Sequence, residues 1–384
     1  MEGVSRANSL FALDLYQALS ASSAEGNIFF SPLSISAVLS MVYLGARGDT
    51  AAEMERVLSL SSVSDVHSHF ESLISSINSP SASYILRLAN RLYGEKSFSF
   101  LPECLDSTMK LYHAELQTVD FIGASEGSRQ LINKWVEKQT ENKIRDLLKP
   151  GMVTTMTRLA LVNAIYFKGK WTHTFQAKYT REMAFKINQK ESHPVRMMHQ
   201  LNKLPFRCLP EYKLQVLELP YIQQELSMLI LLPDETKDGS DPLLKLEKEL
   251  TLEKLLDWTN RDKMDTQGAV IVHLPKFKLE IESCLSETLE KMGMSSVFQE
   301  TKADLTGMGS NGGLFVSAVI HKAFVDVSEE GTEAAAATCV YIITSYVPRP
   351  EPRYYFTADH PFMFFIRHNP SNNILFLGRY RSPS

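Results

Sequence analysis

Residues 323–356 carry the stretch that decides the fold, AFVDVSEEGTEAAAATCVYIITSYVPRPEPRYYF. It starts with strand-like composition and passes through the acidic pair Glu329 and Glu330 to Gly331. A Thr-Glu pair and four alanines follow, then β-branched and aromatic residues at 340–344, and finally prolines and arginines. The rest of the chain is interpreted outward from this stretch.

The middle of this stretch allows three interpretations. Alanine is the best helix former, so residues 333–338 alone predict a short helix. Residues 340–344 instead have strand composition, and Gly331 interrupts the chain just before the alanines. In the third interpretation the segment is a loop in one state and a strand in another. At strand spacing, one of its faces has small side chains first and bulky side chains later, so it could enter between two existing strands. That face comprises Thr332, Ala334, Ala336, Thr338, Val340 and Ile342.

Composition and charge argue against several classes of partner and location. The 384 residues are 44% hydrophobic and 22% charged, and the formal net charge of -4 gives no general reason to expect nucleic acid or an anionic membrane as partner. No run of about 18 apolar residues is present, so no membrane span is predicted. Length alone allows two or three average domains. Without an internal repeat, linker or low-complexity segment, we expect one domain over residues 1–384.

The cysteines and the first helix bear on the compartment. Cys104, Cys208, Cys284 and Cys339 are far apart and form no CxxC pair, so neither a zinc site nor a disulfide framework is predicted. The sequence has no Asn-x-Ser/Thr sequon, and its first apolar stretch is broken by Asp14 and lacks a preceding basic region. We therefore expect a cytoplasmic protein, whose release, if any, occurs without a cleaved signal peptide.

Helices gather early in the chain and strands dominate late, which favours a mixed α+β class over a regular βαβ alternation. Residues 159–167 are nearly continuously apolar, with Asn163 the one polar side chain, and predict a strand buried on both faces. Thr50 and Glu53 have the spacing of a helix capping box. The periodicity further predicts helices at 5–20, 33–43, 126–148, 252–258 and 286–292, strands at 84–93 and 269–279, and hairpins at 214–232 and 361–380.

No enzymatic constellation is present. Residues 307–312 match GxGxxG, but strand-like residues follow where a dinucleotide-binding helix should begin. No GxSxG elbow, HExxH motif or P-loop occurs, and the ten histidines show no metal-ligand spacing. Asn163 and His321 are most simply hydrogen-bonded core residues. We expect neither an enzyme nor a cofactor or metal.

Four long blocks, in order along the chain, resemble the signature blocks of the serpins. They are NIFFSPLSIS (27–36), LVNAIYFKGKW (161–171), EEGTEAAAAT (329–338) and ADHPFMFFIRHNPSNNILFLGRY (358–380). The resemblance covers essentially the whole chain. The start at a helix and the HPF-to-FLGRY end are similar to the ovalbumin-type intracellular branch (clade B).

This resemblance implies a serpin fold of three β-sheets and about nine helices, with an exposed reactive-centre loop at about residues 329–355. It also implies a metastable suicide inhibitor. A target protease cleaves the loop and forms an acyl-enzyme, and the loop then inserts into the main sheet as a new strand. The implied partner is a serine protease in a covalent complex with a monomeric inhibitor, with no nucleic acid or membrane involved.

The resemblance also assigns roles to individual residues. Trp171 falls at the breach, where insertion begins. The shutter, a polar network beneath the strands that must part, is implied at Ser31, Ser34, Asn163 and His321. The hinge of inhibitory members, with a threonine after the glycine and small residues next, is matched by Glu329, Glu330, Gly331, Thr332, Glu333, Ala334, Ala335, Ala336 and Ala337.

The reactive bond is expected within Ser345 to Arg349. The family's loop spacing gives Ser345–Tyr346, and a slip of one residue gives the bond after Tyr346. Chemistry favours the slip, because a tyrosine ring fills the apolar pocket of a chymotrypsin-like protease better than a serine does. Cleavage after Arg349 is disfavoured by Pro350. We expect chymotrypsin- or elastase-like targets; the alternatives are papain-like cysteine proteases, or a non-inhibitory serpin that stores or binds other molecules.

Overall fold

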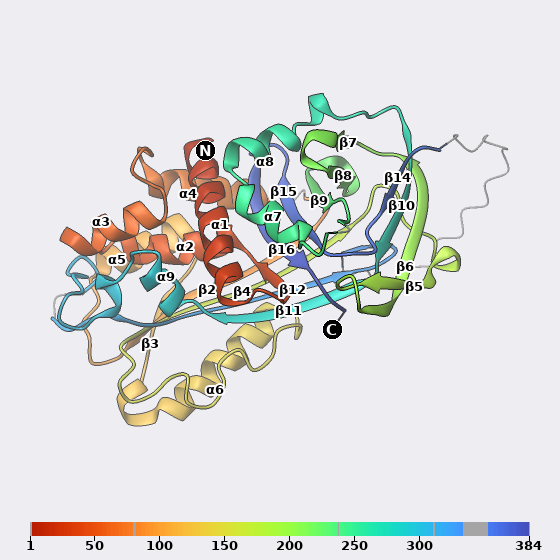
Figure 1. The fold of residues 1–384 in the computed structure, drawn as a ribbon. Helices are drawn as coiled ribbons and strands as arrows, with labels where there is room; N and C mark the ends of the chain where they lie inside the picture. The colour runs from red at the N-terminus through yellow and green to blue at the C-terminus, as the bar shows by residue number, and fades with distance from the viewer. Residues whose placement is uncertain (1, 80–81, 237, 310–311, 333–351, 384) are drawn as a thin grey trace.

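The computed structural model describes residues 2–79, 82–236, 238–309, 312–332 and 352–383. A long central sheet runs along the molecule, with most helices toward one end and the two other sheets toward the opposite end (Figure 1). The described residues contain nine α-helices: α1 (Glu2–Ser22), α2 (Pro32–Tyr43), α3 (Gly48–Val57), α4 (Val66–Ile77), α5 (Pro102–Tyr112), α6 (Phe121–Gln139), α7 (Pro242–Glu249), α8 (Leu252–Trp258) and α9 (Ser286–Lys291).

Three sheets account for the strands of the described residues. The central sheet has the order β11 (Phe277–Cys284), β12 (Val316–Val327), β13 (Gly331–Thr332), β4 (Leu159–Lys170), β2 (Ile85–Glu95) and β3 (Leu116–Val119). The second sheet has the order β1 (Ile28–Phe30), β16 (Asn373–Tyr380), β15 (Phe362–His368), β9 (Leu226–Pro233), β8 (Leu214–Pro220) and β7 (Phe206–Leu209). The end sheet has the order β14 (Pro352–Thr357), β10 (Ala269–Pro275), β6 (Ser192–Lys203) and β5 (Arg181–Lys186).

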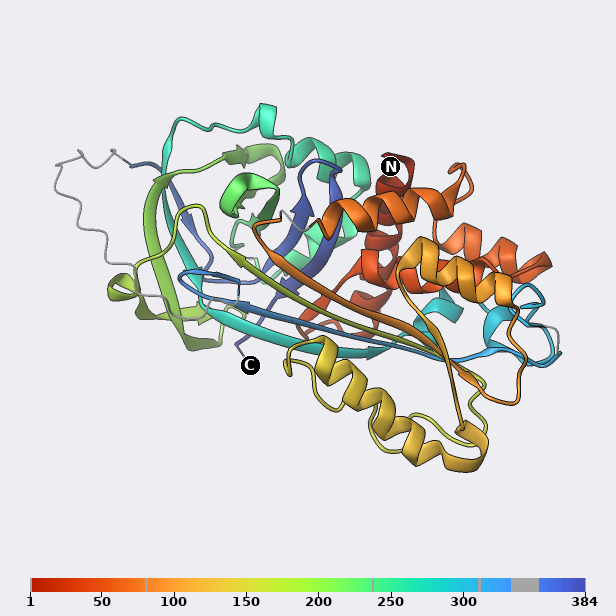
Figure 2. The same cartoon turned by 180° about the vertical axis from the view of Figure 1, so that it is seen from behind.

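Both faces of the central sheet are covered. Helix α6 lies along one face, while α1, α2 and the second sheet lie on the other, as the two opposite views show (Figures 1 and 2). On the α6 side, Phe121, Ile132 and Val136 form a core with Ala164 and Tyr166 of β4. Burial on both faces is the reason that β4 is apolar at nearly every position and not only at alternate ones.

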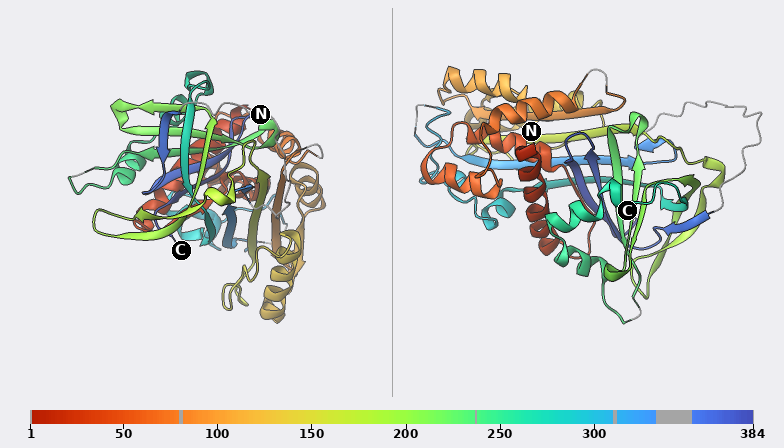
Figure 3. Two further views of the ribbon diagram at one scale, coloured as in Figure 1. Left: turned by 90° about the vertical axis from the view of Figure 1, so that its right-hand side faces the viewer. Right: turned by 90° about the horizontal axis from the view of Figure 1, so that it is seen from above.

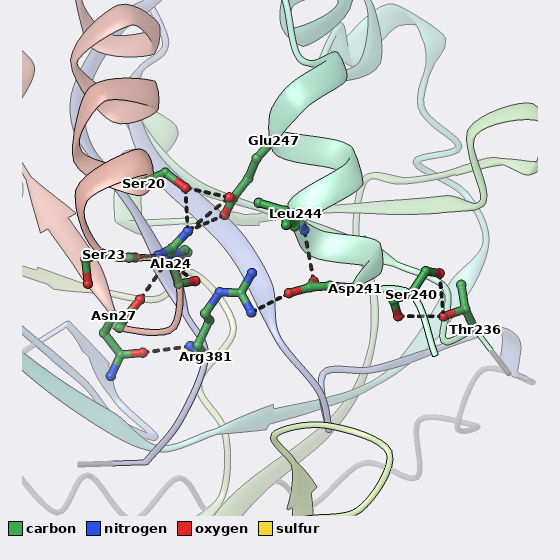
Figure 4. A network of polar contacts seen from close by, with 12 residues as sticks. Ser20, Ser23, Ala24, Asn27, Thr236, Ser240, Asp241, Leu244, Glu247 and Arg381 are labelled. Atoms are coloured by element: carbon green, nitrogen blue, oxygen red, sulfur yellow. Dashed lines mark hydrogen bonds and ion pairs between the residues drawn. The ribbon is translucent and has the colours of Figure 1, made fainter. Parts of the chain in front are cut away.

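A buried ion pair joins the last strand to two helices. Arg379 of β16 is fully buried, and its Nη1 lies 3.0 Å from both carboxylate oxygens of Glu247 on α7. Ser20 of α1 also donates to this carboxylate, and Arg381 pairs with Asp241 at 2.7 Å just before α7 (Figure 4). Removing one partner of a buried pair leaves an uncompensated charge, so this network holds α1, α7 and β16 in one arrangement.

The end sheet contains the strand that follows residues 333–351. Its strand β14 begins at Pro352 and pairs in parallel with β10, which pairs antiparallel with β6. In the view from above in Figure 3, the orange and red helices lie toward one end of the molecule and the green strands toward the other. The chain that leaves β13 in the central sheet therefore returns at the end sheet.

Two predicted elements are wrong in extent. The strand expected at 269–279 is two strands, β10 and β11, which lie in different sheets on either side of Lys276. The apolar pattern does not mark this boundary, because both strands bury apolar side chains and the pattern does not show that they do so in different sheets. The helix expected at 126–148 starts earlier, at Phe121, and ends at Gln139. Ile144 and Leu147 are buried without being helical, so they continue the apolar pattern past the helix end.

The predicted capping box is also wrong. Helix α3 begins at Gly48 with Arg47 as its N-cap and has no side-chain cap. Thr50 instead accepts a hydrogen bond from the backbone N–H of Asp304 at 3.0 Å. Glu53 accepts from the backbone of residues 295 and 296 at 2.8 and 2.7 Å. Both side chains accept hydrogen bonds from backbone N–H groups that are far away in the sequence. Local spacing does not reveal such partners.

The remaining strands and hairpins match their predictions closely, including β4 and the hairpins β8–β9 and β15–β16. Cys104, Cys208 and Cys284 are free thiols, whereas Cys339 lies outside the described residues. Within the described part of the chain, no helix is both long and apolar enough to cross a membrane.

Candidate functional site

The central sheet is open at one end, between its two middle strands. Strands β12 and β4 pair directly and in parallel from Val316 to Phe324. Beyond that point β13 lies between them and is antiparallel to both, with Thr332 opposite Val327 on one side and Gly169 on the other. The first two residues of an additional strand are thus already part of the sheet.

Gly331 is the residue that lets the chain enter this gap. Its backbone φ is 155°, and a Cβ at this position would lie 2.0 Å from the carbonyl oxygen of Gly169. Side chains other than hydrogen cannot be accommodated at that distance, so glycine is required by the close approach of the two backbones.

Thr332 occupies a closed position between the strands. It is fully buried, and its Oγ1 lies 2.7 Å from the hydroxyl of Tyr221, which is itself fully buried. Burial raises the pKa of Tyr221 well above its usual range, so the phenol is neutral and either hydroxyl can donate. A small polar side chain is satisfied here, whereas a charged or bulky side chain would have neither space nor solvent.

The turn between β12 and β13 is held from the β4 side by Trp171. The backbone N–H of Trp171 donates to the carbonyl of Glu330 at 3.0 Å, and its indole Nε1 donates to the carbonyl of Ser328 at 3.0 Å. The indole ring stacks on Tyr221, with ring centroids 4.5 Å apart. Trp171 therefore contacts both the turn and the aromatic residue beneath Thr332.

Glu329 links the same turn to the end sheet. Its carboxylate accepts from Thr180 at 2.9 Å and pairs with Lys276 at 3.0 Å. Burial alone would raise the pKa of Glu329, but backbone hydrogen bonding and the contacts with Lys276 and Thr180 hold it below its ordinary value. The side chain is therefore ionised at neutral pH and fixes the position from which β13 starts.

We call the line along which β12 and β4 pair directly the seam. A buried polar cluster lies on it. His321 of β12 and Asn163 of β4 are register partners, and His321 Nδ1 is hydrogen-bonded to Asn163 Oδ1. The Nδ2 atom of Asn163 donates to Ser34 Oγ at 2.5 Å and to Asn90 Oδ1 of β2 at 2.6 Å. Ser34 also donates to Asn90 at 2.9 Å, so the cluster spans three strands and α2.

The backbone determines the tautomer of His321. The N–H of Ser31 donates to His321 Nε2 at 3.1 Å, so Nε2 is an acceptor and Nδ1 carries the proton donated to Asn163. Complete burial lowers the pKa of His321 to about 3. Because the ring is neutral at physiological pH, the cluster contains no net charge and all of its polar contacts are between neutral groups.

This cluster joins the two strands that a strand continuing from β13 would separate. The hydrogen bond between His321 and Asn163 crosses the seam, as does the edge-to-face ring contact between Tyr166 and Phe324, whose centroids lie 6.1 Å apart. Inserting a strand must break both contacts. Polar groups buried at such a seam need new partners in the inserted strand, because unsatisfied groups cost about 1–3 kcal/mol each.

One group of three potential metal ligands occurs among the described residues, Glu235, Asp359 and His360, whose ligand atoms lie within 4.8 Å of one another. His360 Nδ1 lies 2.8 Å from Asp359, and Nε2 lies 2.7 Å from the carbonyl of Pro233. Both ring nitrogens thus face hydrogen-bonding partners within the protein and not an open ligand position. Lys186 pairs with both carboxylates, so the group is an ion-pair cluster.

Comparison with known proteins gives this geometry its context. The family model described as "Serpin (serine protease inhibitor)" matches residues 6–383. The chain belongs to the serpin family. It is 54% identical over 383 residues to leukocyte elastase inhibitor from Equus caballus and 52% identical over 383 residues to that from Homo sapiens, and each match covers 100% of both chains. These relatives are inhibitors, in agreement with the predicted class of protein.

Solved serpin structures have the same fold. Uncleaved ovalbumin is 36% identical, with a TM-score of 0.90, and the match covers 98% of this chain and 99% of ovalbumin. Maspin is also 36% identical, with a TM-score of 0.91 over 100% of this chain and 99% of maspin. The predicted serpin fold and the resemblance to the ovalbumin-type branch are confirmed.

This serpin brings together the residues to which the sequence resemblance assigned roles, as far as they are described. Ser31, Ser34, Asn163 and His321 form one hydrogen-bonded cluster, and Trp171 contacts the turn formed by Glu329 and Glu330. The reactive-bond residues Ser345 and Tyr346 and the hinge residues Glu333, Ala334, Ala335, Ala336 and Ala337 lie outside the described residues.

Sequence reasoning missed two residues of the site. Asn90 completes the polar cluster, and its only signal in the sequence is an amide within the otherwise strand-like segment 85–95. Tyr221 binds Thr332 and stacks on Trp171, yet in the sequence it is simply an aromatic residue after a proline at a strand end. Neither position is recognisable without the pairing of strands that are distant in the chain.

Proposed function

We propose that this serpin is a suicide inhibitor of chymotrypsin- and elastase-like serine proteases that acts by inserting its cleaved loop between β12 and β4. The protease serine oxygen forms an ester with the carbonyl carbon of the residue before the scissile bond. The C–N bond breaks, and the protonated amine leaves on the C-terminal fragment. Insertion of the loop then carries the tethered protease away and distorts its active site before water hydrolyses the ester.

The position of Thr332 is the observation that supports this mechanism most directly. It lies fully buried between β12 and β4, and β13 already runs antiparallel to both. A chain continuing from Thr332 in the same direction would extend β13 along the seam. The strand-compatible face proposed from the sequence, small at first and bulky later, starts with this residue.

The energy of insertion is sufficient for the proposed role. Exchanging one parallel ladder for two antiparallel ladders over roughly a dozen residues would add about a dozen backbone hydrogen bonds, at around 1 kcal/mol net each. Burying Val340 and Ile342 would add about 1.5–3 kcal/mol per side chain. The sum, on the order of 10 kcal/mol or more, also implies that the uncleaved protein is kinetically trapped.

The target class is proposed from the loop sequence and from the relatives. Cleavage after Tyr346 suits the apolar primary pocket of a chymotrypsin-like protease, and cleavage after Ser345 suits the small primary pocket of an elastase-like one. The names of the relatives describe inhibitors of leukocyte elastase, which favours the same class of protease. An arginine-directed protease is a weaker alternative, because Pro350 follows Arg349.

We further propose that the protein acts as a single-domain monomer in the cytoplasm. The free thiols support this compartment, since Cys208 and Cys284 are exposed and exposed free thiols persist where the environment is reducing. The shared core of α1, α2 and the second and central sheets supports one folding unit over the whole chain.

The test is incubation of the full-length protein with a panel of chymotrypsin-like, elastase-like, trypsin-like and papain-like proteases. We expect a complex that survives denaturing electrophoresis with the first two, and a released peptide that starts at Tyr346 or Val347. A peptide starting at Pro350 or Tyr354 would reassign the target class. Cleavage without any denaturation-resistant complex across the panel would contradict inhibition by acyl-enzyme trapping.

A further inference from the structure

Two histidines face each other across neighbouring strands of the end sheet. His199 on β6 and His273 on β10 are direct register partners in an antiparallel pair. His199 Nδ1 lies 3.2 Å from His273 Nε2, and the ring centroids are 4.9 Å apart. Both side chains are half-buried, and neither belongs to the seam where the loop would insert.

A surface cavity opens beside this pair. It has a volume of about 310 Å³ and is lined by Tyr179, Arg181, Met183, Met197, His199 and His273. The ring of Tyr179 stands edge-on to His199, with centroids 6.1 Å apart. This space is sufficient for an ion with bound water, since one water molecule takes up about 30 Å³ of liquid volume. Arg181 is exposed, so its long side chain can turn toward solvent.

The other ring nitrogen of His273 has a partner on the third strand. Thr357 of β14 is the register partner of His273, and its hydroxyl oxygen lies 3.4 Å from His273 Nδ1. If Nδ1–H donates to this hydroxyl, the lone pair of Nε2 points toward His199. Burial lowers the pKa of His273, the neighbouring His199 lowers it further, and Asp359 opposes the shift.

We propose that His199 and His273 form a binding site for a divalent transition-metal ion such as Zn²⁺, with water completing the coordination. The ion takes the place of the proton between His199 Nδ1 and His273 Nε2, and this proton is released to solvent. Two nitrogen ligands at about 2.0–2.1 Å and a tetrahedral angle are separated by about 3.3 Å, close to the 3.2 Å between these atoms. Imidazole nitrogens suit Zn²⁺, Cu²⁺ and Ni²⁺, and a hydrogen-bonded second ring nitrogen is the usual companion of a metal-binding histidine.

Such an ion would join β6 to β10, and through the Thr357 hydroxyl it would also act on β14. Strand β14 begins at Pro352, where the chain returns to the fold after residues 333–351, and the site lies at the other end of this strand, beside Thr357. This function does not depend on the proposed protease target. It would add stability to the end sheet whenever the ion is bound.

The test is isothermal titration of the full-length, uncleaved protein with zinc chloride, alongside the variants His199→Gln and His273→Gln. We expect one ion per chain and binding that is at least about tenfold weaker in either variant. The matched control is His193→Gln, which removes an exposed histidine from the same strand and should leave binding unchanged. Circular dichroism without metal verifies that each variant folds.

A second readout separates metal ligation from a simple hydrogen bond between the rings. One equivalent of Cu²⁺ should give an electron paramagnetic resonance spectrum with hyperfine splitting from two nitrogen ligands, and either single variant should lose it. Zinc should also raise the melting temperature of the unaltered protein and of His193→Gln, but not of the other two variants. Equal zinc affinity in all four proteins, or no saturable binding to the unaltered protein, would overturn the site.

Discussion

Thr332→Arg should convert this serpin from an inhibitor into a substrate. Thr332 is fully buried between β12 and β4 and is bonded to Tyr221 at 2.7 Å. Because β13 comprises only two residues, the arginine can leave the sheet in the uncleaved protein at little cost. After cleavage it must return between the strands, so the penalty falls on the insertion step.

The size of the expected effect is set by the hydrogen bond that is lost and by the absence of a partner for the guanidinium. The substitution loses one neutral hydrogen bond, worth about 1 kcal/mol, and an unpaired guanidinium in this closed site costs several kcal/mol more. If about 3 kcal/mol of this reaches the transition state for insertion, insertion slows by roughly 100-fold. Hydrolysis of the acyl-enzyme is unaffected, so most cleavage events should end in release of active protease.

The assay is the stoichiometry of inhibition against chymotrypsin, measured by residual activity and by denaturing electrophoresis. The unaltered protein should form a stable complex near one-to-one, whereas Thr332→Arg should be cleaved with little complex formed. Glu330→Arg is the matched control, because it introduces the same side chain at the turn and outside the paired strands. Complex formation by Thr332→Arg at one-to-one stoichiometry would refute the reasoning.

The remaining predictions concern metastability, pH, the turn glycine and the reactive bond. Protein cleaved in its loop should melt well above intact protein, because the inserted strand adds ladder hydrogen bonds; equal melting temperatures by calorimetry would exclude insertion. Burial lowers the pKa of His321 to about 3 in the folded protein, whereas a histidine in the unfolded state has a pKa near 6.5. Between these two pH values the unfolded state therefore binds more protons than the folded state. The free energy of unfolding should therefore fall by up to about 1.4 kcal/mol per pH unit as pH drops from about 6.5 toward 3. Denaturant titrations should show a shallower fall in His321→Gln, and an equal slope would rule out this assignment. Gly331→Ala should expel β13, since its Cβ would lie 2.0 Å from the carbonyl oxygen of Gly169, and faster proteolysis of the loop would report this; an unchanged cleavage rate would contradict it. Tyr346→Ala should weaken chymotrypsin inhibition by about tenfold or more if the ring supplies about 1.5–3 kcal/mol, with Ser345→Ala as the control and unchanged kinetics as the contrary result.

The sequence by itself determined the elements whose signals are local. The nearly continuous apolar run of β4 predicted a strand buried on both faces, and the hairpins β8–β9 and β15–β16 were predicted from apolar runs around polar turns. The four signature blocks identified the family, and through it the predicted roles of Asn163, His321 and Trp171. Each of these signals lies within a short window, where residue type and spacing carry the information.

Only the tertiary structure decided which of these residues meet. His321 and Asn163 are 158 positions apart, and their hydrogen bond exists because β12 and β4 pair in one particular register. Asn90 joins them only because β2 pairs with β4 on the other side. The division of 269–279 between two sheets was likewise settled by tertiary pairing.

The position of β13 between β12 and β4 was likewise decided only by the tertiary structure. Thr332 is buried because β12 and β4 stay apart beyond Phe324 and because Tyr221, which follows the end of β8, supplies a hydroxyl beneath it. Local composition could suggest that the segment after Gly331 is able to form a strand. Whether a gap existed to receive it depended on the free energies of pairing and packing between distant segments, and these are defined only in the folded protein.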